Sequence, residues 1–161
     1  MKSNLPSNTS CTIGIIGLGY VGLPLALAFS NTDTCRKSGN ILSRKIIGFD
    51  TNNNRINELL RNIDSTEEFS QEEINNSGEI TFTSNKNALY EVDIFIVTVP
   101  TPINKAKQPN LKFVQSASEY VGEAIKGRVN KNKNAPIIIF ESTVYPGLTE
   151  EFCVPIIESF S

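Results

Sequence analysis

Residues 12–26, TIGIIGLGYVGLPLA, decide the fold of this chain. A short β-branched run from Ile13 to Ile16 leads into the pattern Gly17-x-Gly19-x-x-Gly22, and an apolar segment compatible with a helix follows. A strand, a tight glycine turn and a helix N-terminus in this order are typical of a dinucleotide-binding unit. Such a glycine pattern also occurs in purely structural turns, but the preceding strand and the following helix favour a nucleotide site.

Each glycine of this pattern has an expected task. Gly17 permits the tight turn, Gly19 lets the backbone come close to a pyrophosphate, and Gly22 lets the helix pack closely. The free N–H groups and the positive end of the helix dipole would then hold the phosphate charge.

The composition excludes several classes of protein. At 161 residues the chain fits one domain, which buries about 70% of its unfolded surface. With 15 basic and 17 acidic residues, the chain offers no case for binding nucleic acid or an anionic membrane. No apolar run approaches the roughly 20 residues of a membrane span, and the polar N-terminus has no signal-peptide core.

The cysteine and histidine content bears on metals and nucleophiles. Cys11, Cys35 and Cys153 are unclustered and lack CxxC spacing, so we interpret them as reduced cytosolic thiols and not as a disulfide framework or zinc site. The sequence has no histidine, which excludes Ser-His and Cys-His nucleophiles and His-ligated metals. No metal site is predicted, and a cytoplasmic location is expected.

A second predicted strand, residues 45–50, ends in an acid. Asp50 follows Gly22 by 28 residues, against about 20 for this kind of unit, and the polar segment 31–44 accounts for the surplus as a surface loop or helix extension. An acid here can accept both ribose hydroxyls of the adenosine half and repels a 2′-phosphate, which favours NAD over NADP. The alternative is that Asp50 only caps the helix that begins near Asn52.

The rest of the chain continues the alternation of strands and helices. Strands are predicted over 79–83, 93–99 and 135–141, and helices over 21–30, 52–61, 70–76, 86–90, 111–126 and 148–160. We predict a flexible arm over 1–11 and, over 12–161, an α/β domain with a Rossmann-type doubly wound parallel sheet. In the strand order 3-2-1-4-5-6 the sixth strand would follow the last helix, so we expect a sheet that lacks its last strand through truncation. Pro155 is expected to kink or end that helix.

Hydroxyl side chains follow the two strands expected beside the switch in strand order. Thr98 and Thr101 lie at the end of one strand, and Ser142 and Thr143 at the end of the other, where they could meet a ribose, nicotinamide or substrate. Taken singly, such residues are more often turn or cap residues. The nearby Glu150 and Glu151 are interpreted as first-turn helix residues and not as a catalytic pair.

Four motifs together resemble the N-terminal domain of the nucleotide-sugar 6-dehydrogenases, the family of UDP-glucose dehydrogenase. These are GLGYVGLPLA at 17–26, GFD at 48–50 with Arg55-Ile56, VTVPTP at 97–102 and ESTVYPG at 141–147. PTPI at 100–103 and ESTVYPG at 141–147 look most like the bacterial branch that acts on UDP-N-acetylhexosamines for polysaccharide synthesis. The likeness runs from about Thr12 to the C-terminus.

The resemblance implies a cofactor, a set of contacts and a reaction. NAD would be held by Gly17, Leu18, Gly19, Tyr20, Val21, Gly22, Asp50, Arg55, Val97, Thr98, Val99, Pro100, Thr101, Ser142, Thr143 and Val144. Thr143 would also face the nicotinamide and the substrate C6, where it helps to orient a catalytic water. Family members oxidise the C6 alcohol of a UDP-sugar to a carboxylate in two NAD-dependent steps through an enzyme-bound thioester.

The sequence departs from the family because it lacks the catalytic cysteine and the segments that follow this domain in the family. The catalytic cysteine and its neighbours follow the sixth strand in the family, and none of Cys11, Cys35 or Cys153 stands in the matching context. The central helix, through which the full-length protein would form a homodimer, and the domain that binds the UDP-sugar are also absent. We therefore expect this chain to bind NAD without turnover, with the UDP-sugar as a partner of the full-length protein only.

Two alternatives share the glycine turn. A β-hydroxyacid or 6-phosphogluconate-type dehydrogenase would have it, but is not expected to carry both VPTP and STVYPG. A non-enzymatic nucleotide-sensing module would also combine the turn with an acid after the second strand.

Overall fold

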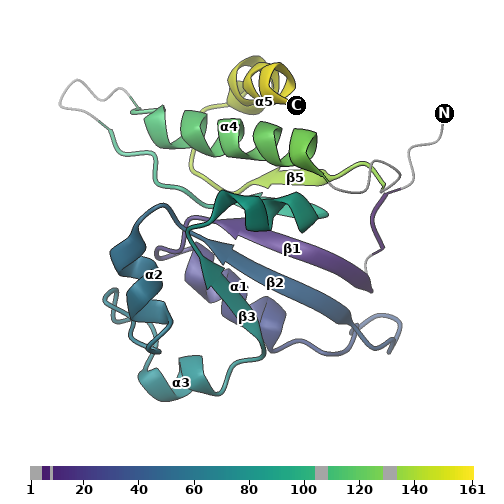
Figure 1. The fold of residues 1–161 in the computed structure, drawn as a ribbon, viewed down its shortest axis with the longest axis vertical. Helices are drawn as coiled ribbons and strands as arrows, with labels where there is room; N and C mark the ends of the chain where they lie inside the picture. Colours follow the sequence, from purple (N-terminus) through teal and green to yellow (C-terminus); the bar gives the residue numbers. More distant parts are fainter. Residues whose placement is uncertain (1–4, 8, 104–108, 129–133) are drawn as a thin grey trace.

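The computed structural model describes residues 5–7, 9–103, 109–128 and 134–161. Its centre is a parallel sheet of five strands in the order β3-β2-β1-β4-β5 (Figure 1). The strands are β1 (Ser10–Ile16), β2 (Ser43–Phe49), β3 (Ile80–Thr83), β4 (Ile94–Val97) and β5 (Ile137–Phe140). This is the order predicted for the first five strands of a doubly wound sheet, and the predicted fold class is confirmed.

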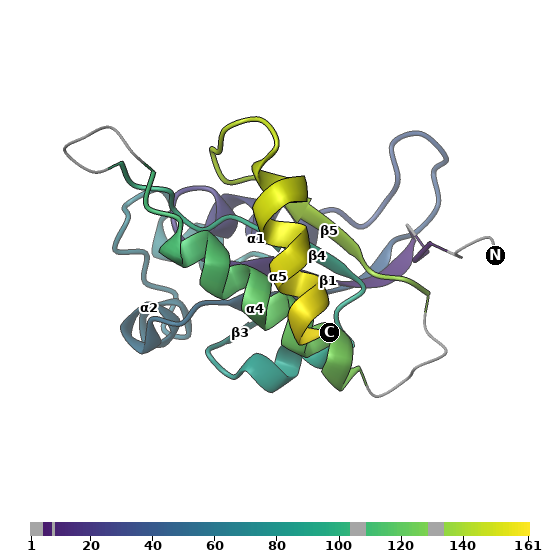
Figure 2. The ribbon, with the colours of Figure 1, turned by 90° about the horizontal axis from the view of Figure 1, so that it is seen from above.

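Helical segments cover both faces of the sheet (Figures 1 and 2). One face carries α1 (Gly22–Ser30), α2 (Asn53–Leu59) and α3 (Gln71–Asn75). The other carries the 3₁₀ helix η1 (Lys86–Glu91) and α4 (Lys112–Gly127). Outside α4 lie the π-helical η2 (Thr149–Cys153) and α5 (Val154–Phe160), which crosses α4 in the view from above.

The central strand β1 is buried on both faces, as expected for a parallel strand. All residues from Cys11 to Ile16 are buried. Alternate side chains enter two cores: Ile13 and Ile15 pack beneath α1, whereas Ile16 packs beneath α4. The close packing of Val92, the residue after η1, favours a glycine at position 14, since a Cβ there would lie 2.7 Å from a Val92 methyl.

The strand register sets the position of the functional residues. Ile16, the last residue of β1, pairs with Phe49 of β2 and with Val97 of β4, and Val97 in turn pairs with Phe140 of β5. The four strands therefore end at the same edge of the sheet. The residues that follow them, including Gly17 and Asp50, are brought together there although they are far apart in the sequence.

The ends of the chain differ in part from the prediction. β1 begins at Ser10, inside the predicted arm, because Cys11 is buried in the core and pairs with Arg44 in the register of β2. The loop between α1 and β2 supplies the predicted surplus of residues. Pro155 does not end the last helix: it lies in the first turn of α5, where its missing N–H costs little, and a π-helical turn precedes it.

Candidate functional site

A cleft of about 830 Å³ lies at the edge where the strands end. Its walls come mainly from the loops that follow β1, β2, β4 and β5 and from one face of α4. The structure brings most of the predicted site residues to this cleft, namely Gly17, Leu18, Gly19, Tyr20, Val21, Asp50, Arg55, Thr98, Val99, Pro100, Thr101, Ser142 and Thr143. Three predicted residues do not line it: Gly22 and Val97 are buried, and Val144 packs against the cluster of Val114, Leu148 and Cys153.

The glycine turn has the backbone that its sequence predicts. Gly17 has a φ of +96°, a conformation that favours glycine, and its N–H donates to the carbonyl of Phe49 at 2.8 Å. A Cβ at Gly22 would lie 1.8 Å from the Gly17 carbonyl oxygen, so only glycine fits there. A Cβ at Gly19 would meet no atom within 4 Å. The turn is tightly packed on its inner side and open at Gly19.

The N-terminus of α1 follows this turn and suits an anion. Its N-cap, Val21, offers no side-chain hydrogen bond, and the first turn of the helix contains no acidic residue. The first N–H groups and the positive end of the helix dipole are therefore not neutralised by a side chain of the helix itself. Beside the open space at Gly19, this is the environment that a phosphate requires.

Asp50 lies at the end of β2 and connects two loops. Its Oδ2 accepts a hydrogen bond from the Leu18 N–H at 2.8 Å, and its Oδ1 accepts one from the Asn52 N–H at 2.9 Å. Each carboxylate oxygen has a second lone pair that can still accept from a ligand. The cap of α2 is Asn52, which accepts from the N–H groups of Asn54 and Arg55. The alternative in which Asp50 only caps this helix is therefore wrong.

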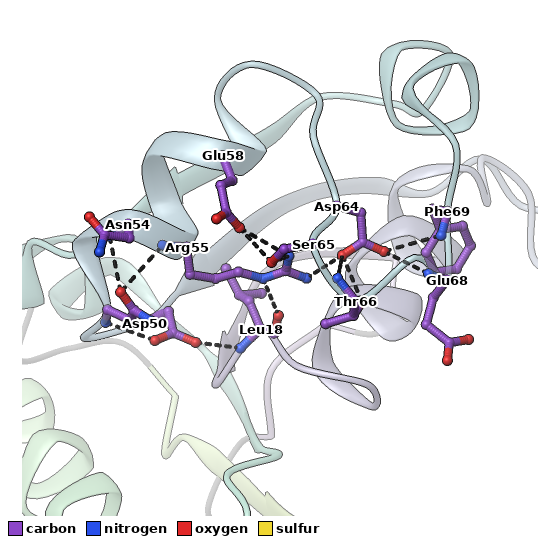
Figure 3. Close-up of polar contacts among 11 residues, drawn as sticks. Leu18, Asp50, Asn54, Arg55, Glu58, Asp64, Ser65, Thr66, Glu68 and Phe69 are labelled. Atoms are coloured by element: carbon purple, nitrogen blue, oxygen red, sulfur yellow. Dashed lines mark hydrogen bonds and ion pairs between the residues drawn. The ribbon is translucent and has the colours of Figure 1, made fainter.

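Arg55 extends from α2 past Leu18 of the glycine turn toward Asp64 (Figure 3). Its Nε donates to the carbonyl of Leu18 at 2.8 Å, and its Nη2 forms an ion pair with Oδ1 of Asp64 at 2.8 Å. Arg55 is only 6% exposed. It lines the cleft, yet most of its guanidinium is occupied by the protein itself, which makes it part of the frame of the site.

Asp64 is the buried partner in this pair and sequence reasoning did not find it. Besides Arg55, it accepts hydrogen bonds from the N–H and hydroxyl of Thr66 and from the N–H groups of Glu68 and Phe69. Burial raises the pKa of the Asp64 carboxyl, but the hydrogen bonds from Thr66 and Arg55 outweigh it and hold the pKa below its usual value. The group is an anion near neutral pH.

The predicted hydroxyl residues tie the loops together. Thr98 donates to the carbonyl of Gly17 at 2.7 Å, Thr101 to that of Thr143 at 2.6 Å, and Ser142 to that of Val99 at 2.6 Å. Each hydroxyl gives its proton to the protein, and its oxygen can still accept from a ligand. Thr143 is exposed and lines the cleft.

One wall of the cleft was not predicted from the sequence. It is the face of α4 formed by Phe113, Ser116, Ala117 and Tyr120. Tyr120 packs edge to face on Phe49, with ring centroids 5.4 Å apart, and Phe113 is 48% exposed. The i, i+3, i+4, i+7 spacing of these residues marks a single helix face, but only the packing of α4 shows which strand ends it adjoins.

The cysteines and the potential metal ligands of the described residues limit the chemistry that is open to them. Their three cysteines are free thiols, and burial raises the pKa of Cys11 and of Cys153. Within the described ranges, no group of three or more His, Cys, Asp or Glu side chains could hold a metal ion. None of the helices described is both long enough and apolar enough to span a membrane.

Comparison with known proteins identifies the family. Residues 11–161 match the NAD binding domain of the UDP-glucose/GDP-mannose dehydrogenase family. The chain belongs to this family. It is 45% identical over 149 residues to the UDP-N-acetyl-D-glucosamine 6-dehydrogenase of Pseudomonas aeruginosa, and 43% identical over 149 residues to protein CapL of Staphylococcus aureus. Both alignments cover 92% of this chain and 31% of the relative, so the chain spans under a third of their length.

Solved structures share the fold. A ternary complex of GDP-mannose dehydrogenase from Pseudomonas aeruginosa matches with a TM-score of 0.77 at 24% identity, covering 92% of this chain and 32% of that one. The lactate dehydrogenase of Eimeria maxima, with NADH and oxamate, gives a TM-score of 0.54 at 21% identity, covering 96% and 41%. As an NAD-binding domain of this family, the chain has NAD as its cofactor. The open space at Gly19, the uncapped helix and the acid at Asp50 fit a dinucleotide.

Proposed function

We propose that this chain supplies the NAD site of a UDP-sugar 6-dehydrogenase that oxidises the C6 alcohol of a UDP-N-acetylhexosamine to a carboxylate for polysaccharide precursor synthesis. Support for the substrate class comes from the relatives, since two UDP-N-acetyl-D-glucosamine 6-dehydrogenases are 45% and 44% identical to the chain. Membership of a dehydrogenase family also favours this function over a non-enzymatic sensor.

Different residues of the cleft would hold different parts of the cofactor. The turn at Gly19 and the N-terminus of α1 would hold the pyrophosphate, and Asp50 would accept the hydroxyls of the adenosine ribose. The loops that contain Val99–Thr101 and Ser142–Thr143 would meet the nicotinamide half. When bound, NAD supplies the acceptor for the hydride that leaves the substrate carbon.

Thr143 is the residue of this chain proposed to face the reaction. Its exposed side chain lies at the end of β5, and the Thr101 hydroxyl holds its carbonyl. We propose that it orients a catalytic water. The catalytic cysteine, the UDP-sugar site and the homodimer contact are proposed for parts of the family fold outside this chain, which by itself would bind NAD without turnover. The three free thiols support a cytoplasmic location.

The observation that carries the NAD site of this proposal is the position of Asp50. Its carboxylate lies at the cleft and holds the Leu18 N–H of the glycine turn, so the acid and the phosphate-binding turn form one unit. A 2′-phosphate beside this carboxylate would bring two negative charges together. The site should therefore prefer NAD to NADP.

A calorimetric titration with NAD and NADP tests the proposal. Asp50→Asn keeps an oxygen that can accept from Leu18 but removes the charge, and Asp33→Asn, on the exposed loop between α1 and β2, is the matched control. We expect Asp50→Asn to weaken NAD binding by about tenfold or more, which corresponds to the hydrogen bonds of a charged acceptor, and to narrow the preference over NADP. Equal binding of NAD and NADP by the unmodified chain would refute the role of Asp50.

A further inference from the structure

The backbone N–H and the backbone carbonyl of Leu18, at the centre of the glycine turn, are each held by a charged side chain. Its N–H donates to Asp50 Oδ2 at 2.8 Å, and its carbonyl accepts from Arg55 Nε at 2.8 Å. The Leu18 side chain is completely buried beneath the turn. Hydrogen bonds with charged partners are stronger than neutral ones, so this residue has little freedom to rotate.

This anchoring determines where the next amide points. The described residues contain no cis peptide bond, and in a planar trans peptide the carbonyl and the following N–H point in opposite directions. Because Arg55 draws the Leu18 carbonyl toward α2, the N–H of Gly19 points away from α2. Within the described residues this N–H donates to no other group. Gly19 lines the cleft and faces open space.

Arg55 in turn depends on Asp64. An arginine side chain has many rotamers, and one that must meet a single carbonyl loses most of that freedom. Here the guanidinium meets two carboxylates, Asp64 at 2.8 Å and Glu58 at 3.7 Å. The closer pair with Asp64 is the more buried one, with side-chain exposures of 7% for Arg55 and 0% for Asp64 against 35% for Glu58. Asp64 is itself fixed by hydrogen bonds from the loop that follows it, two of them from Thr66 (Figure 3).

We propose that Asp64 is a positioning residue for cofactor binding: through Arg55 it fixes the Leu18 carbonyl and thereby presents the following glycine amide to the pyrophosphate. Asp64 does not line the cleft, so it can act only through the residues that it holds. Arg55 and Thr66 both line the cleft, and the proposed role is exerted through Arg55. The inference rests on the proposed NAD site. It assigns the buried pair a task in binding, beyond its contribution to folding.

A second, largely buried ion pair in the described residues provides a control. Arg128 Nη2 lies 2.9 Å from Asp93 Oδ1, with side-chain exposures of 7% and 17%. Asp93 precedes β4 and accepts from the Thr12 N–H near the start of β1, so this pair lies at the end of the strands opposite the cleft. Weakening either pair should destabilise the fold, but only the Asp64 pair should affect the glycine turn.

The test compares ADP, which carries the pyrophosphate, with adenosine, which does not. Asp64→Asn removes the charge that fixes Arg55, and Arg128→Lys is the control. NAD is titrated first, by NMR, into the unmodified chain. We expect Asp64→Asn to raise the dissociation constant for ADP by about tenfold, the equivalent of one hydrogen bond to a charged group, and that for adenosine by less than about twofold. The Gly19 amide resonance should move in Asp64→Asn and stay in place in Arg128→Lys.

The outcomes separate the inference from the proposed function. If the unmodified chain does not bind NAD, the proposed site fails. If it binds NAD, the positioning role is overturned when Asp64→Asn weakens the binding of ADP and of adenosine equally, or weakens the binding of neither. Should Asp64→Asn not fold, Arg55→Lys replaces it, because lysine keeps a charge beside Asp64 but its single ammonium cannot also reproduce the Nε contact with Leu18. We expect the same selective loss of affinity for ADP in Arg55→Lys, and the absence of that loss would overturn the inference.

Discussion

Replacing Gly19 by alanine separates binding from folding at the glycine turn. A Cβ at this position meets no atom within 4 Å, and φ lies outside the left-handed region. The methyl group should therefore be accommodated without strain, and the stiffer unfolded chain should leave the free energy of unfolding unchanged or raise it by up to about 1 kcal/mol. The methyl would project into the space where a phosphate must approach to within about 3 Å of an amide. We expect NAD affinity to fall by at least about tenfold, or about 1.4 kcal/mol.

Gly22→Ala is the contrasting variant. Its Cβ would lie 1.8 Å from the Gly17 carbonyl oxygen and 2.6 Å from Thr98 Oγ1, and a backbone atom cannot yield as a side-chain tip can. Overpacking of this kind costs about 1–3 kcal/mol or more and lowers Tm by about 2–4 °C per kcal/mol in a chain of this size. Thermal unfolding and NAD titration of both variants form the assay. Normal NAD binding by Gly19→Ala, or its failure to fold, would refute the account of the turn.

Two further predictions concern the frame of the site. Thr98→Val keeps the shape of the side chain but leaves the Gly17 carbonyl without the hydroxyl that donates at 2.7 Å, so we expect a loss of about 1–3 kcal/mol in urea unfolding; a change below about 0.5 kcal/mol would show that this hydrogen bond is dispensable. The folded-state pKa of Asp64 lies below its unfolded value of about 3.9, so its contribution to stability is complete above about pH 4 and is lost as pH falls through the folded pKa. Between pH 5 and 2, the free energy of unfolding of the unmodified chain should fall more steeply with decreasing pH than that of Asp64→Asn. Parallel curves of unfolding free energy against pH would contradict this assignment.

The strands and the glycine turn could be predicted because their causes are local, and the strand order follows from the general topology of doubly wound sheets. Continuous apolar runs mark buried parallel strands, and Gly17 and Gly22 are required by a positive φ and a close contact. The position of Asp50 at the cleft follows from the end of its strand. These features need no knowledge of how distant segments pack.

The features that escaped prediction depend on tertiary contacts. The pairing of Arg55 with Asp64 requires the loop after α2 to fold back, and that path is set by hydrogen bonds to the Asp64 carboxylate itself. The resemblance placed Arg55 among the cofactor contacts, whereas the structure shows a guanidinium largely engaged by the protein. The contribution of α4 depends on which of its faces turns toward Phe49, as the contact of Tyr120 shows.

A crystal structure of this chain with NAD would test the central claim most directly, since the cleft predicts where each part of the cofactor lies. The account predicts a dinucleotide with its pyrophosphate against Gly19 and the N-terminus of α1, and with its adenosine ribose hydroxyls on Asp50. It would be contradicted by NAD bound outside the cleft, or by a pyrophosphate that makes no contact with the glycine turn.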